Sequence, residues 1–535
     1  MESAPQHTDP PPPADDVRAE PEHEGDVRSN DELASAAAHG LRWIAYARIA
    51  IELTLFGSMV ILARLISPVD FGIFAIVVIL QELALSIPAE GIGSALVQKK
   101  TITKDHMRGG LLLSLAVGMI LLVLTLVLSY FVFDPIFGSK TAWLAAATAP
   151  FYLLGAIYAA PTAVLRRALD FRRLSMIELL SSTVRAFATL GLAIIGLNAG
   201  ALVFGSLLSL AAAVALALVF APVPWPRWRP KEMRDLLTFG GPASLASVAW
   251  AGFRNGDYAV IGATLGPALA GIYWRAYQLA VEYQRKITIA MAQIAFPVLA
   301  RTAGVEQMLA LRQRMVQLLA VVLFPLLAVL FLVAPTLVPW MYGSQWDAAV
   351  TPTQILVIGG ASTLMIDACG SALMAVGRAR TILGFGIAHF AFYVGTVLAV
   401  VHLGLTAVAI GGAVIHTLFL CVAYWVLLQG LVKNPLRVLW QDAAPALIGC
   451  VALVAVALPV NLLLESAHWA AVPHMFTVAA AGGVAYMVAL RLLFPACSRD
   501  LHGVLRKLVP DRVLNAFRRR PRLPMIGGPA SADKV

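Results

Sequence analysis

Fourteen long apolar segments follow one another along this chain, and they leave few folds open to it. A helix needs about 20 consecutive apolar residues to cross the hydrocarbon core of a bilayer. Hydrophobic residues make up 59% of the chain and charged residues only 13%, so the apolar surface exceeds what one water-soluble core can bury. The sequence therefore predicts an all-α integral membrane protein with fourteen transmembrane helices, and it excludes soluble enzymes and nucleic-acid-binding domains. The segments lie at roughly 42–66, 71–97, 109–131, 142–165, 174–196, 200–221, 237–262, 268–292, 315–341, 351–376, 380–402, 405–430, 442–463 and 470–494.

Lysine and arginine are distributed unequally between the two sets of predicted loops. Short loops that carry Lys and Arg stay on the cytoplasmic side of a membrane. One set of alternate loops holds twenty-one of these residues, whereas the other set holds only Lys140, with Arg64 at a helix end. The distribution predicts that both termini are cytoplasmic.

The two ends of the chain carry opposite charge. Residues 1–32 hold ten acidic residues against two arginines, a net charge of −8, and such a stretch is expected to be disordered. Residues 495–535 hold nine basic and three acidic residues. Apolar residues recur at helical spacing from Leu501 to Leu508, which fits either an amphipathic helix on an anionic membrane surface or a solvated basic tail.

The predicted loops are too short to form a catalytic domain. The longest external loop runs roughly from residue 464 to 469. The chain also lacks a phosphate-binding loop with a GKS or GKT ending, so we expect no ATP hydrolysis. A membrane-embedded polymerase or ligase would need a large external loop. These features favour a transporter over an enzyme, and we expect no cofactor and no metal site.

Three short matches, in order and at nearly one spacing, indicate an internal repeat. Residues 66–74 match residues 265–273 at an offset of 199, and Phe137-Gly138-Ser139 matches Tyr342-Gly343-Ser344 at an offset of 205. Residues 201–205 match residues 407–411 at an offset of 206. The repeated unit contains six predicted helices, an even number, so both copies have the same orientation in the membrane. The repeat predicts two pseudo-symmetric six-helix bundles around a central cavity, with two extra C-terminal helices.

Three motifs in the first twelve predicted helices resemble those of a known family. Residues 64–72 resemble the R-L-x-x-P-x-D-F-G signature of bacterial polysaccharide exporters, and residues 165–173 resemble their L-x-R-x-x-D-F-R-R loop. Residues 257–273 resemble their D-Y-x-x-I-G-x-x-L-G-x-x-x-x-G-x-Y stretch. The family is the Wzx-type oligosaccharide flippase branch of the superfamily that also holds multidrug exporters of the MATE type and lipid II flippases.

The resemblance implies a place in the bacterial inner membrane and movement of undecaprenyl-pyrophosphate-linked oligosaccharide from the inner to the outer leaflet. The implied partners are this lipid-linked oligosaccharide, membrane lipids, a polysaccharide polymerase and glycosyltransferases, and no nucleic acid. The predicted parts are an acidic cytoplasmic tail (1–41), a first six-helix lobe (42–221), a cytoplasmic linker (222–236), a second six-helix lobe (237–430), helices 13 and 14 (442–494) and a basic cytoplasmic tail (495–535).

Four arginines within predicted spans are candidates for binding an anionic headgroup: Arg48, Arg185, Arg254 and Arg275. Charged groups are costly inside a membrane and usually face a wet cavity or a partner. The planar guanidinium group of arginine can donate two parallel hydrogen bonds, a fork of donors that matches the oxygens of a pyrophosphate. The alternative is that these charges form structural ion pairs that lock helices together, because Arg48 with Glu52, Glu178 with Arg185, and Arg275 with Glu282 share helix faces.

Four acidic residues are candidates for binding a coupling proton or sodium ion: Glu82, Asp257, Glu282 and Asp367. A carboxylate in a low-dielectric site can load and release a proton. The alternative is that each is a neutral or arginine-paired structural acid. His389 and His416 are candidate proton relays, although a histidine on an apolar helix is more often part of the core.

Two functions compete at this point. The first is a flippase for undecaprenyl-pyrophosphate-linked oligosaccharide that works by alternating access and supplies a surface polysaccharide such as exopolysaccharide or O-antigen. The second is a cation-coupled, multidrug-type antiporter for small molecules, whose cavity is expected to be narrower, more acidic and more aromatic. The four membrane arginines favour the flippase.

Overall fold

The computed structural model describes residues 30–99, 101–288, 291, 304–375 and 379–508, and some side chains in these ranges, including those of residues 30–47, lie outside the description. Nearly all of the described residues are helical, and no β-strand is found among them. The N-terminal helix begins at Asn30, inside the stretch predicted as an acidic tail. The rest of that tail, and most of the basic tail, lie outside the described residues.

The helices follow the predicted apolar segments closely. Eleven described helical segments are long and apolar enough to cross a membrane. Three further predicted segments, 42–66, 237–262 and 268–292, fall on α1, α10 and α11 with η3, and the count of fourteen spans stays a prediction. In chain order the helices are α1 (Asn30–Leu65), α2 (Pro68–Pro88), η1 (Ala89–Gly93), α3 (Ser94–Gln98), α4 (Lys104–Leu128), η2 (Ser129–Phe133), α5 (Asp134–Phe137), α6 (Ser139–Ala147), α7 (Pro150–Arg167), α8 (Phe171–Ile194), α9 (Ala199–Phe220), α10 (Pro230–Thr264), α11 (Pro267–Tyr277), η3 (Gln278–Glu282), α13 (Val305–Tyr342), η4 (Ser344–Ala349), α14 (Val350–Ala375), α15 (Ala379–Val400), η5 (Val401–Leu403), α16 (Leu405–Leu428), α17 (Pro435–Ser466), α18 (Ala471–Leu493) and α19 (Pro495–Leu508).

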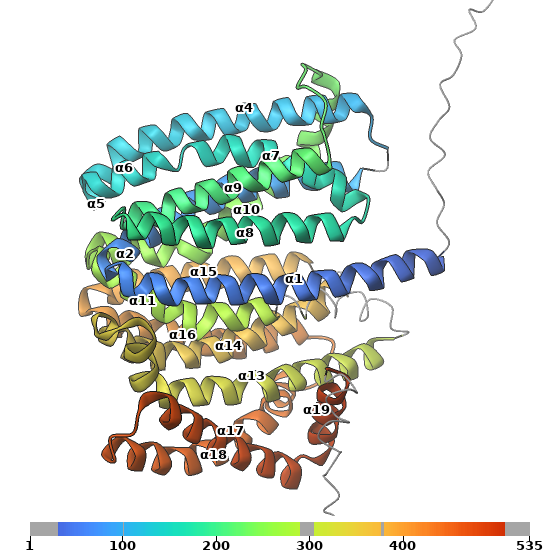
Figure 1. The fold of residues 1–535 in the computed structure, drawn as a ribbon. Helices are drawn as coiled ribbons and strands as arrows, with labels where there is room; N and C mark the ends of the chain where they lie inside the picture. The colour runs from blue at the N-terminus through green and yellow to red at the C-terminus, as the bar shows by residue number, and fades with distance from the viewer. Residues whose placement is uncertain (1–29, 100, 289–290, 292–303, 376–378, 509–535) are drawn as a thin grey trace, which may run out of the picture.

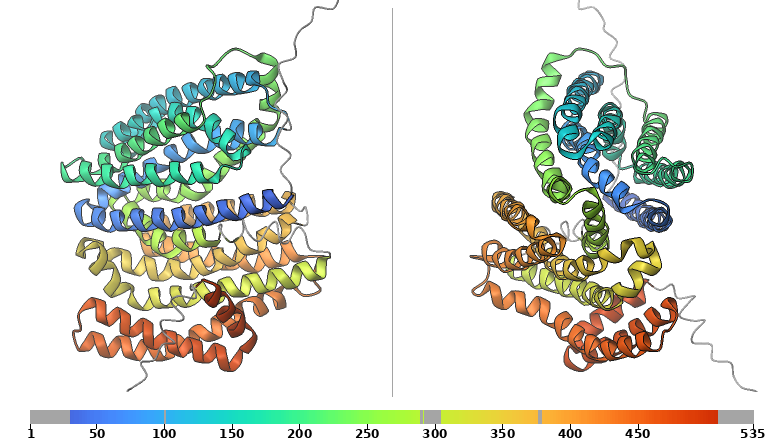
Figure 2. Two further views of the ribbon diagram at one scale, coloured as in Figure 1. Left: turned by 45° about the vertical axis from the view of Figure 1, so that its right-hand side comes forward. Right: turned by 90° about the vertical axis from the view of Figure 1, so that its left-hand side faces the viewer.

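The helices form two groups, one above the other in Figure 1 and seen nearly along their axes in the right-hand view of Figure 2. In the upper group α1 packs against α8, α8 against α9, and α4 against α7. In the lower group α14 packs against α16, α15 against α16, and α13 against α14. Helix α10 joins the groups, because it contacts α2, η1 and α4 of the upper group as well as α11 and α15.

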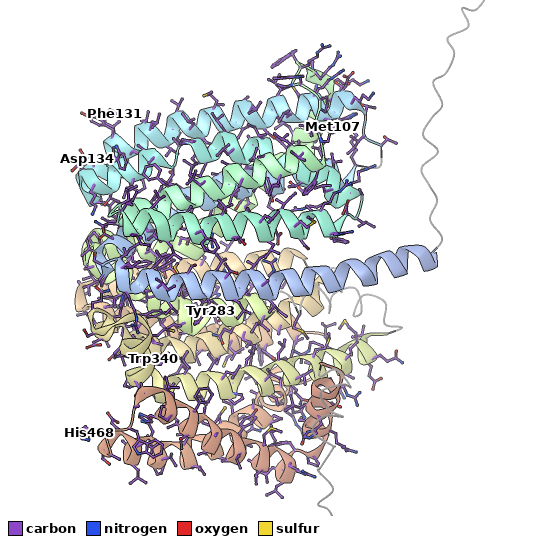
Figure 3. The ribbon with its side chains drawn as sticks, viewed as in Figure 1. Met107, Phe131, Asp134, Tyr283, Trp340 and His468 are labelled. Carbon is purple, nitrogen blue, oxygen red and sulfur yellow. The ribbon has the colours of Figure 1, made fainter. Side chains whose placement is uncertain are left out.

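Loops predicted to share one side of the membrane gather at one end of the bundle. Phe131, Asp134, Trp340 and His468, all in or beside predicted external loops, lie at one end, and Met107 lies toward the other (Figure 3). The end that holds Trp340 is called the external end below, after the predicted orientation.

Backbone geometry at the helix starts repeats between the two groups. Gly138 before α6 has φ 84° and ψ 162°, and its repeat partner Gly343 before η4 has φ 99° and ψ 162°. Asn198 before α9 and Gly404 before α16 share a positive φ but differ in ψ, which is −120° and 176°. The pairs are separated by the predicted offsets of 205 and 206, and at Gly138 and Gly343 the repeat seen in the sequence is also a repeat of backbone conformation.

The first repeat pair brings the two groups into direct contact at the external end. Ser67 caps α2 by accepting a hydrogen bond from the Asp70 amide at 3.2 Å, and Pro68 occupies the first turn, where its missing N–H costs nothing. A Cβ on Gly72 would lie 1.6 Å from the Pro267 carbonyl oxygen, and a Cβ on Gly271 would lie 2.0 Å from the Pro68 carbonyl oxygen. Helices α2 and α11 therefore cross backbone to backbone, and only glycine permits this approach.

Further bonds join the groups at the same end. The Trp346 indole Nε1 donates to the Ala63 carbonyl at 2.8 Å, and Gln345 donates to the same oxygen at 2.7 Å. The Arg64 guanidinium donates to the carbonyls of Trp340 and Met341. These contacts link the end of α1 to the end of α13, so the external ends of the two groups are closed against each other.

Helices α17 and α18 pack on the outer side of the lower group, against α13. A fully buried ion pair fixes α17 in place: Arg312 Nη2 on α13 lies 2.7 Å from Asp442 Oδ2 on α17. The same Asp442 oxygen accepts a 2.7 Å hydrogen bond from the Tyr424 hydroxyl on α16. The two extra helices thus belong structurally to the second lobe.

Candidate functional site

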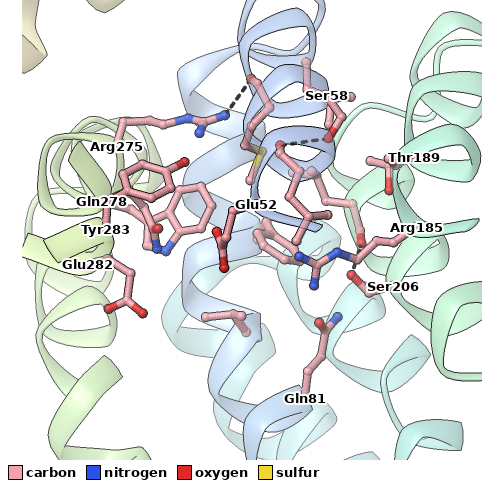
Figure 4. Close-up of a pocket in the computed structure, with 18 of the residues that line it drawn as sticks. Glu52, Ser58, Gln81, Arg185, Thr189, Ser206, Arg275, Gln278, Glu282 and Tyr283 are labelled. Carbon is pink, nitrogen blue, oxygen red and sulfur yellow. Dashed lines mark hydrogen bonds between the residues drawn. The ribbon is translucent and has the colours of Figure 1, made fainter. Parts of the chain in front are cut away.

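A central cavity of about 300 Å³ lies between the two groups of helices. Its walls come from α1, α2, α8 and α9 on one side and from α11, η3 and residues 283–288 on the other, as Figure 4 shows. The lining residues are Glu52, Leu55, Ser58, Met59, Leu62, Phe74, Val78, Gln81, Glu82, Arg185, Ala186, Thr189, Leu202, Ser206, Trp274, Arg275, Gln278, Glu282, Tyr283 and Lys286. The lining thus combines charges of both signs with hydroxyl and amide groups.

Arg185 extends from α8 into this cavity, toward Glu52 on α1 (Figure 4). Within the described residues its guanidinium makes no hydrogen bond and no close ion pair, although the Glu52 carboxylate acts on it through space. Its side chain is exposed to the cavity space. Of the two predicted arginines that line the cavity, Arg185 and Arg275, Arg185 therefore offers the more accessible fork of donors to a ligand.

Arg275 also lines the cavity, but the surrounding protein already holds its guanidinium. The residue is 1% exposed, and its Nη2 donates to the Met59 carbonyl of α1 at 3.3 Å. Its guanidinium carbon lies 4.1 Å from the ring centroid of Phe71 and 5.1 Å from that of Tyr342. A cation is favourable above aromatic rings, so this contact fixes α11 against α1, while Arg275 Nε has no hydrogen-bond partner.

The acidic residues of the cavity are each matched with a donor on another residue. Glu52 Oε2 lies 2.8 Å from Lys286 Nζ, and Glu282 lies 2.8 Å from an Arg285 nitrogen. Glu82 Oε2 accepts a 2.8 Å hydrogen bond from the Asn255 amide on α10. The two predicted ion-coupling candidates Glu82 and Glu282 thus lie in the cavity with donors already in place.

The ion pairs within single helices that the sequence suggested are not the ones formed. Arg48 on α1 lies 3.9 Å from Glu178 on α8, and both side chains are half exposed. The pair lies outside the cavity lining. The partners that form instead are Glu178 for Arg48, Lys286 for Glu52 and Arg285 for Glu282, because helix packing, which sequence spacing does not report, sets the side-chain positions. The side chain of Arg254 lies outside the described residues.

The other two predicted ion-coupling acids lie apart from the cavity lining. Asp257 on α10 is 2% exposed, and its Oδ2 accepts a 2.7 Å hydrogen bond from the Tyr393 hydroxyl on α15. Asp367 on α14 has an accessible side chain and lies close enough to Arg285 and Glu282 to act on them through space. The structure therefore separates the four candidate acids into two in the cavity lining, one in a buried cluster of the second lobe and one beside the Glu282–Arg285 pair.

Sequence reasoning missed the uncharged polar lining of the cavity. Gln81 on α2 points into it (Figure 4), is 6% exposed, and has an Nε2 without any hydrogen-bond partner. Thr189 and Ser206, on α8 and α9, lie on the same wall. A buried amide donor without a partner is costly, so Gln81 is suited to a polar ligand. Its position as a polar residue within a long apolar span was the available signal.

The fold is that of the MOP-superfamily transporters. The structure titled "Inward-facing conformation of a multidrug resistance MATE family transporter of the MOP superfamily" aligns with a TM-score of 0.57 at 15% identity, over 74% of this chain and 99% of that one. The lipid II flippase MurJ in an inward closed conformation aligns with a TM-score of 0.66 at 11% identity, over 86% of this chain and 99% of that one.

Sequence comparison then identifies the family. The model of a family described as "Polysaccharide biosynthesis protein" matches residues 61–351, and the chain belongs to this family. An "Uncharacterized membrane protein in cps region" of Klebsiella pneumoniae is 25% identical over 401 residues, 74% of this chain and 82% of that protein. The teichuronic acid biosynthesis protein TuaB of Bacillus subtilis (strain 168) is 26% identical over 421 residues, 77% of this chain and 86% of that protein.

The resemblance predicted from the three motifs is thereby confirmed. The chain is a multi-pass membrane protein of a family described by its role in polysaccharide biosynthesis, and its fold is one that transporters share.

Proposed function

We propose that this protein is a flippase that moves undecaprenyl-pyrophosphate-linked oligosaccharide across the bacterial inner membrane for surface polysaccharide biosynthesis. The main observation in support of this proposal is the central cavity between the two lobes. Arg185 extends into this cavity without a direct carboxylate partner among the described residues. Family membership supports the same class of function.

The cavity chemistry suits the headgroup of such a substrate. Pyrophosphate is anionic and accepts paired hydrogen bonds, which a guanidinium fork supplies. Sugars carry hydroxyl groups, and the amides and hydroxyls of Gln81, Gln278, Thr189 and Ser206 match them. The lipid tail stays in the bilayer, and the two lobes (42–221 and 237–430) rock to expose the cavity to either side.

The cellular arrangement follows from this proposal. Both termini face the cytoplasm, and glycosyltransferases there supply the substrate. A polysaccharide polymerase on the other side of the membrane consumes it. The fourteen predicted spans agree with this orientation, because an even number of spans returns the chain to the side of the membrane on which it began.

The competing antiporter fits the cavity less well. A multidrug antiporter needs acidic groups available to a cationic drug. Here Lys286 and Arg285 already pair with Glu52 and Glu282, and Glu82 accepts from Asn255, so a cationic ligand would have to displace donors that are already in place.

The test uses a strain that lacks this gene but keeps the upstream glycosyltransferases. Lipid-linked oligosaccharide is expected to accumulate on the cytoplasmic face, measured by its accessibility to a sugar-cleaving enzyme in spheroplasts and in inverted vesicles. Wild-type protein restores access from the outer face. Arg185→Ala is expected to restore it about 10–100-fold less well, the loss of one hydrogen-bonded charge contact of about 1.5–3 kcal/mol.

Arg437→Ala serves as the matched control, because Arg437 is exposed on α17 and away from the cavity. Full rescue by Arg185→Ala would leave the flippase in place but remove Arg185 from the site. Normal oligosaccharide on the outer face of the deletion strain, together with sensitivity to toxic small molecules, would support the antiporter instead.

A further inference from the structure

A second group of polar side chains lies buried in the second lobe, outside the central cavity. Asp257 on α10 accepts a 2.7 Å hydrogen bond from the Tyr393 hydroxyl and a 2.9 Å hydrogen bond from the Tyr258 amide. The hydroxyl of Tyr393 also lies 3.2 Å from that of Tyr273 on α11. None of these residues lines the cavity.

Two histidines extend this group on the other side of Tyr393. His389 Nε2 on α15 lies 3.0 Å from His416 Nδ1 on α16, and both residues are buried. The ring of Tyr393 stacks on His416, with 5.0 Å between centroids and 21° between planes. The proton cluster, as we name it, consists of Asp257, Tyr273, Tyr393, His389 and His416.

The charge of the proton cluster depends on a single proton. With an ionised Asp257 and two neutral imidazoles the cluster carries one negative charge, and no cation contacts Asp257 among the described residues. An uncompensated charge inside a membrane protein is costly. One added proton, on the carboxylate or shared by the imidazoles, makes the cluster neutral, so the buried environment favours its uptake.

Among the described side chains, none that bonds to Asp257, Tyr273 or Tyr393 supplies that positive charge. The groups nearest the cluster on α10 and α11 are the phenols of Tyr258 and Tyr277. Beyond Tyr277 lie Glu282 and Arg285, which pair with each other, and Asp367 on α14. The face of α14 against His416 presents Gly359, which carries no charge.

The ligand atoms suit a proton better than a sodium ion. Sodium is a hard cation that prefers several oxygen ligands, whereas imidazole nitrogens suit protons and transition metals. Two of the polar groups here are imidazoles already in hydrogen-bond contact, and the phenols are occupied with Asp257 and with each other.

Helix α10 connects the proton cluster to the central cavity. Asn255 and Asp257 are two residues apart, so they point to nearly opposite sides of the helix. Asn255 donates to Glu82 in the cavity, and Asp257 accepts from Tyr393 in the second lobe. One turn of α10 therefore bonds to the cavity wall on one side and to the proton cluster on the other.

We propose that the proton cluster is the proton-binding site that couples transport to a proton gradient. The inference rests on the proposed flippase function for its role, but the binding of a proton stands separately. Uptake of one proton from one side of the membrane neutralises the cluster, and its release to the other side returns Asp257 to the ionised form.

The first experiment measures proton binding without any substrate. The purified full chain in weakly buffered detergent solution is titrated between about pH 5 and pH 8, where histidine pairs commonly change charge. Wild type is expected to bind one proton more per chain than the double variant His389→Gln/His416→Gln. His402→Gln is measured alongside as the control for loss of an ordinary histidine, because His402 is exposed in η5.

Asp257→Asn is a second variant that tests the same proton if the double histidine variant does not fold. It removes the negative charge while it keeps the shape of the side chain, so the proton is expected to be lost in this variant too. Equal proton uptake by wild type, Asp257→Asn and the histidine variant would overturn the proposal.

The second experiment measures coupling in proteoliposomes that contain lipid extract from the deletion strain as the source of lipid-linked oligosaccharide. A gradient of one pH unit across the membrane is expected to drive up to about tenfold accumulation on one face, since one unit equals a factor of ten for one proton. Asp257→Asn and the histidine variant are expected to equilibrate the oligosaccharide without accumulation.

Transport by wild type that ignores a pH gradient but follows a sodium gradient would overturn the proton site and leave the flippase intact. Absence of oligosaccharide movement under every gradient would count against the proposed function. In that case the proton titration alone decides whether the cluster binds a proton.

Discussion

Replacing Gly271 with alanine tests the closest contact between the two lobes. The new methyl group would lie 2.0 Å from the Pro68 carbonyl oxygen and 2.7 Å from the Gly72 amide nitrogen. A carbon and an oxygen in contact need about 3.3–3.6 Å, so α2 and α11 must separate by more than about 1 Å. Both clashing atoms belong to backbone, which cannot rotate away as a side chain would.

The expected cost follows from two opposing effects. Overpacking of a tight contact costs about 1–3 kcal/mol, and separation of the helices also loosens the Phe71–Trp274 stack, whose ring centroids are 6.0 Å apart. Alanine is favoured over glycine in a helix by about 1 kcal/mol. The control is Gly57→Ala on α1, where a methyl group meets nothing within 4 Å and only the helix preference acts.

The assay is thermal unfolding of the purified full chain in detergent, followed by tryptophan fluorescence at one scan rate. Gly271→Ala is expected to lower Tm by roughly 2–8 °C, whereas Gly57→Ala leaves it unchanged or raises it. Gly72→Ala, with a contact of 1.6 Å, is expected to cost more. The double variant should lose less than the sum, because both methyl groups separate the same pair of helices.

Single alanine variants as stable as Gly57→Ala would refute the backbone contact. Strictly additive losses in the double variant would also refute it, since they would mean that the two glycines act at independent sites.

Three further predictions concern other contacts. Asp442→Ala leaves the buried Arg312 without its carboxylate and is expected to cost about 3–5 kcal/mol, seen as a lower Tm; a loss no larger than that of the exposed Arg437→Ala would contradict this. Trp346→Phe removes the bond to the Ala63 carbonyl and is expected to cost about 0.5–1.5 kcal/mol in the same assay, while unchanged stability would show that the bond contributes nothing. Gln81→Leu removes the unpartnered amide from the cavity and, given the proposed function, should slow oligosaccharide movement about 2–10-fold without lowering Tm; an unchanged rate would mean that the amide does not meet the substrate.

Much of the architecture could be predicted because the membrane restricts the chain so strongly. Apolar length and Lys/Arg placement outline the helices, and glycines at fixed offsets reveal the repeat. The match of Gly138 with Gly343 in backbone angles shows why: a chain reversal that needs positive φ retains its glycine in both copies. Charges in apolar spans were equally visible, and two of the four predicted arginines line the cavity.

Pairing between helices could not be predicted, because it depends on how each helix is rotated in the bundle. Spacing suggested Arg48 with Glu52, yet packing places Arg48 near Glu178 and Glu52 near Lys286. Gln81 escaped notice for a different reason. An uncharged amide in an apolar helix is unremarkable until the structure shows that its donor has no partner.

The ionisable groups that line the cavity consist of three carboxylates and three cations, so their formal charges cancel. Given the proposed function, a cavity loaded with a pyrophosphate headgroup is negative, and each elementary charge moved outward across 100 mV, negative inside, gains about 2.3 kcal/mol. The membrane voltage thus favours outward movement of the loaded cavity, and it acts in addition on any proton that the proton cluster carries across the membrane.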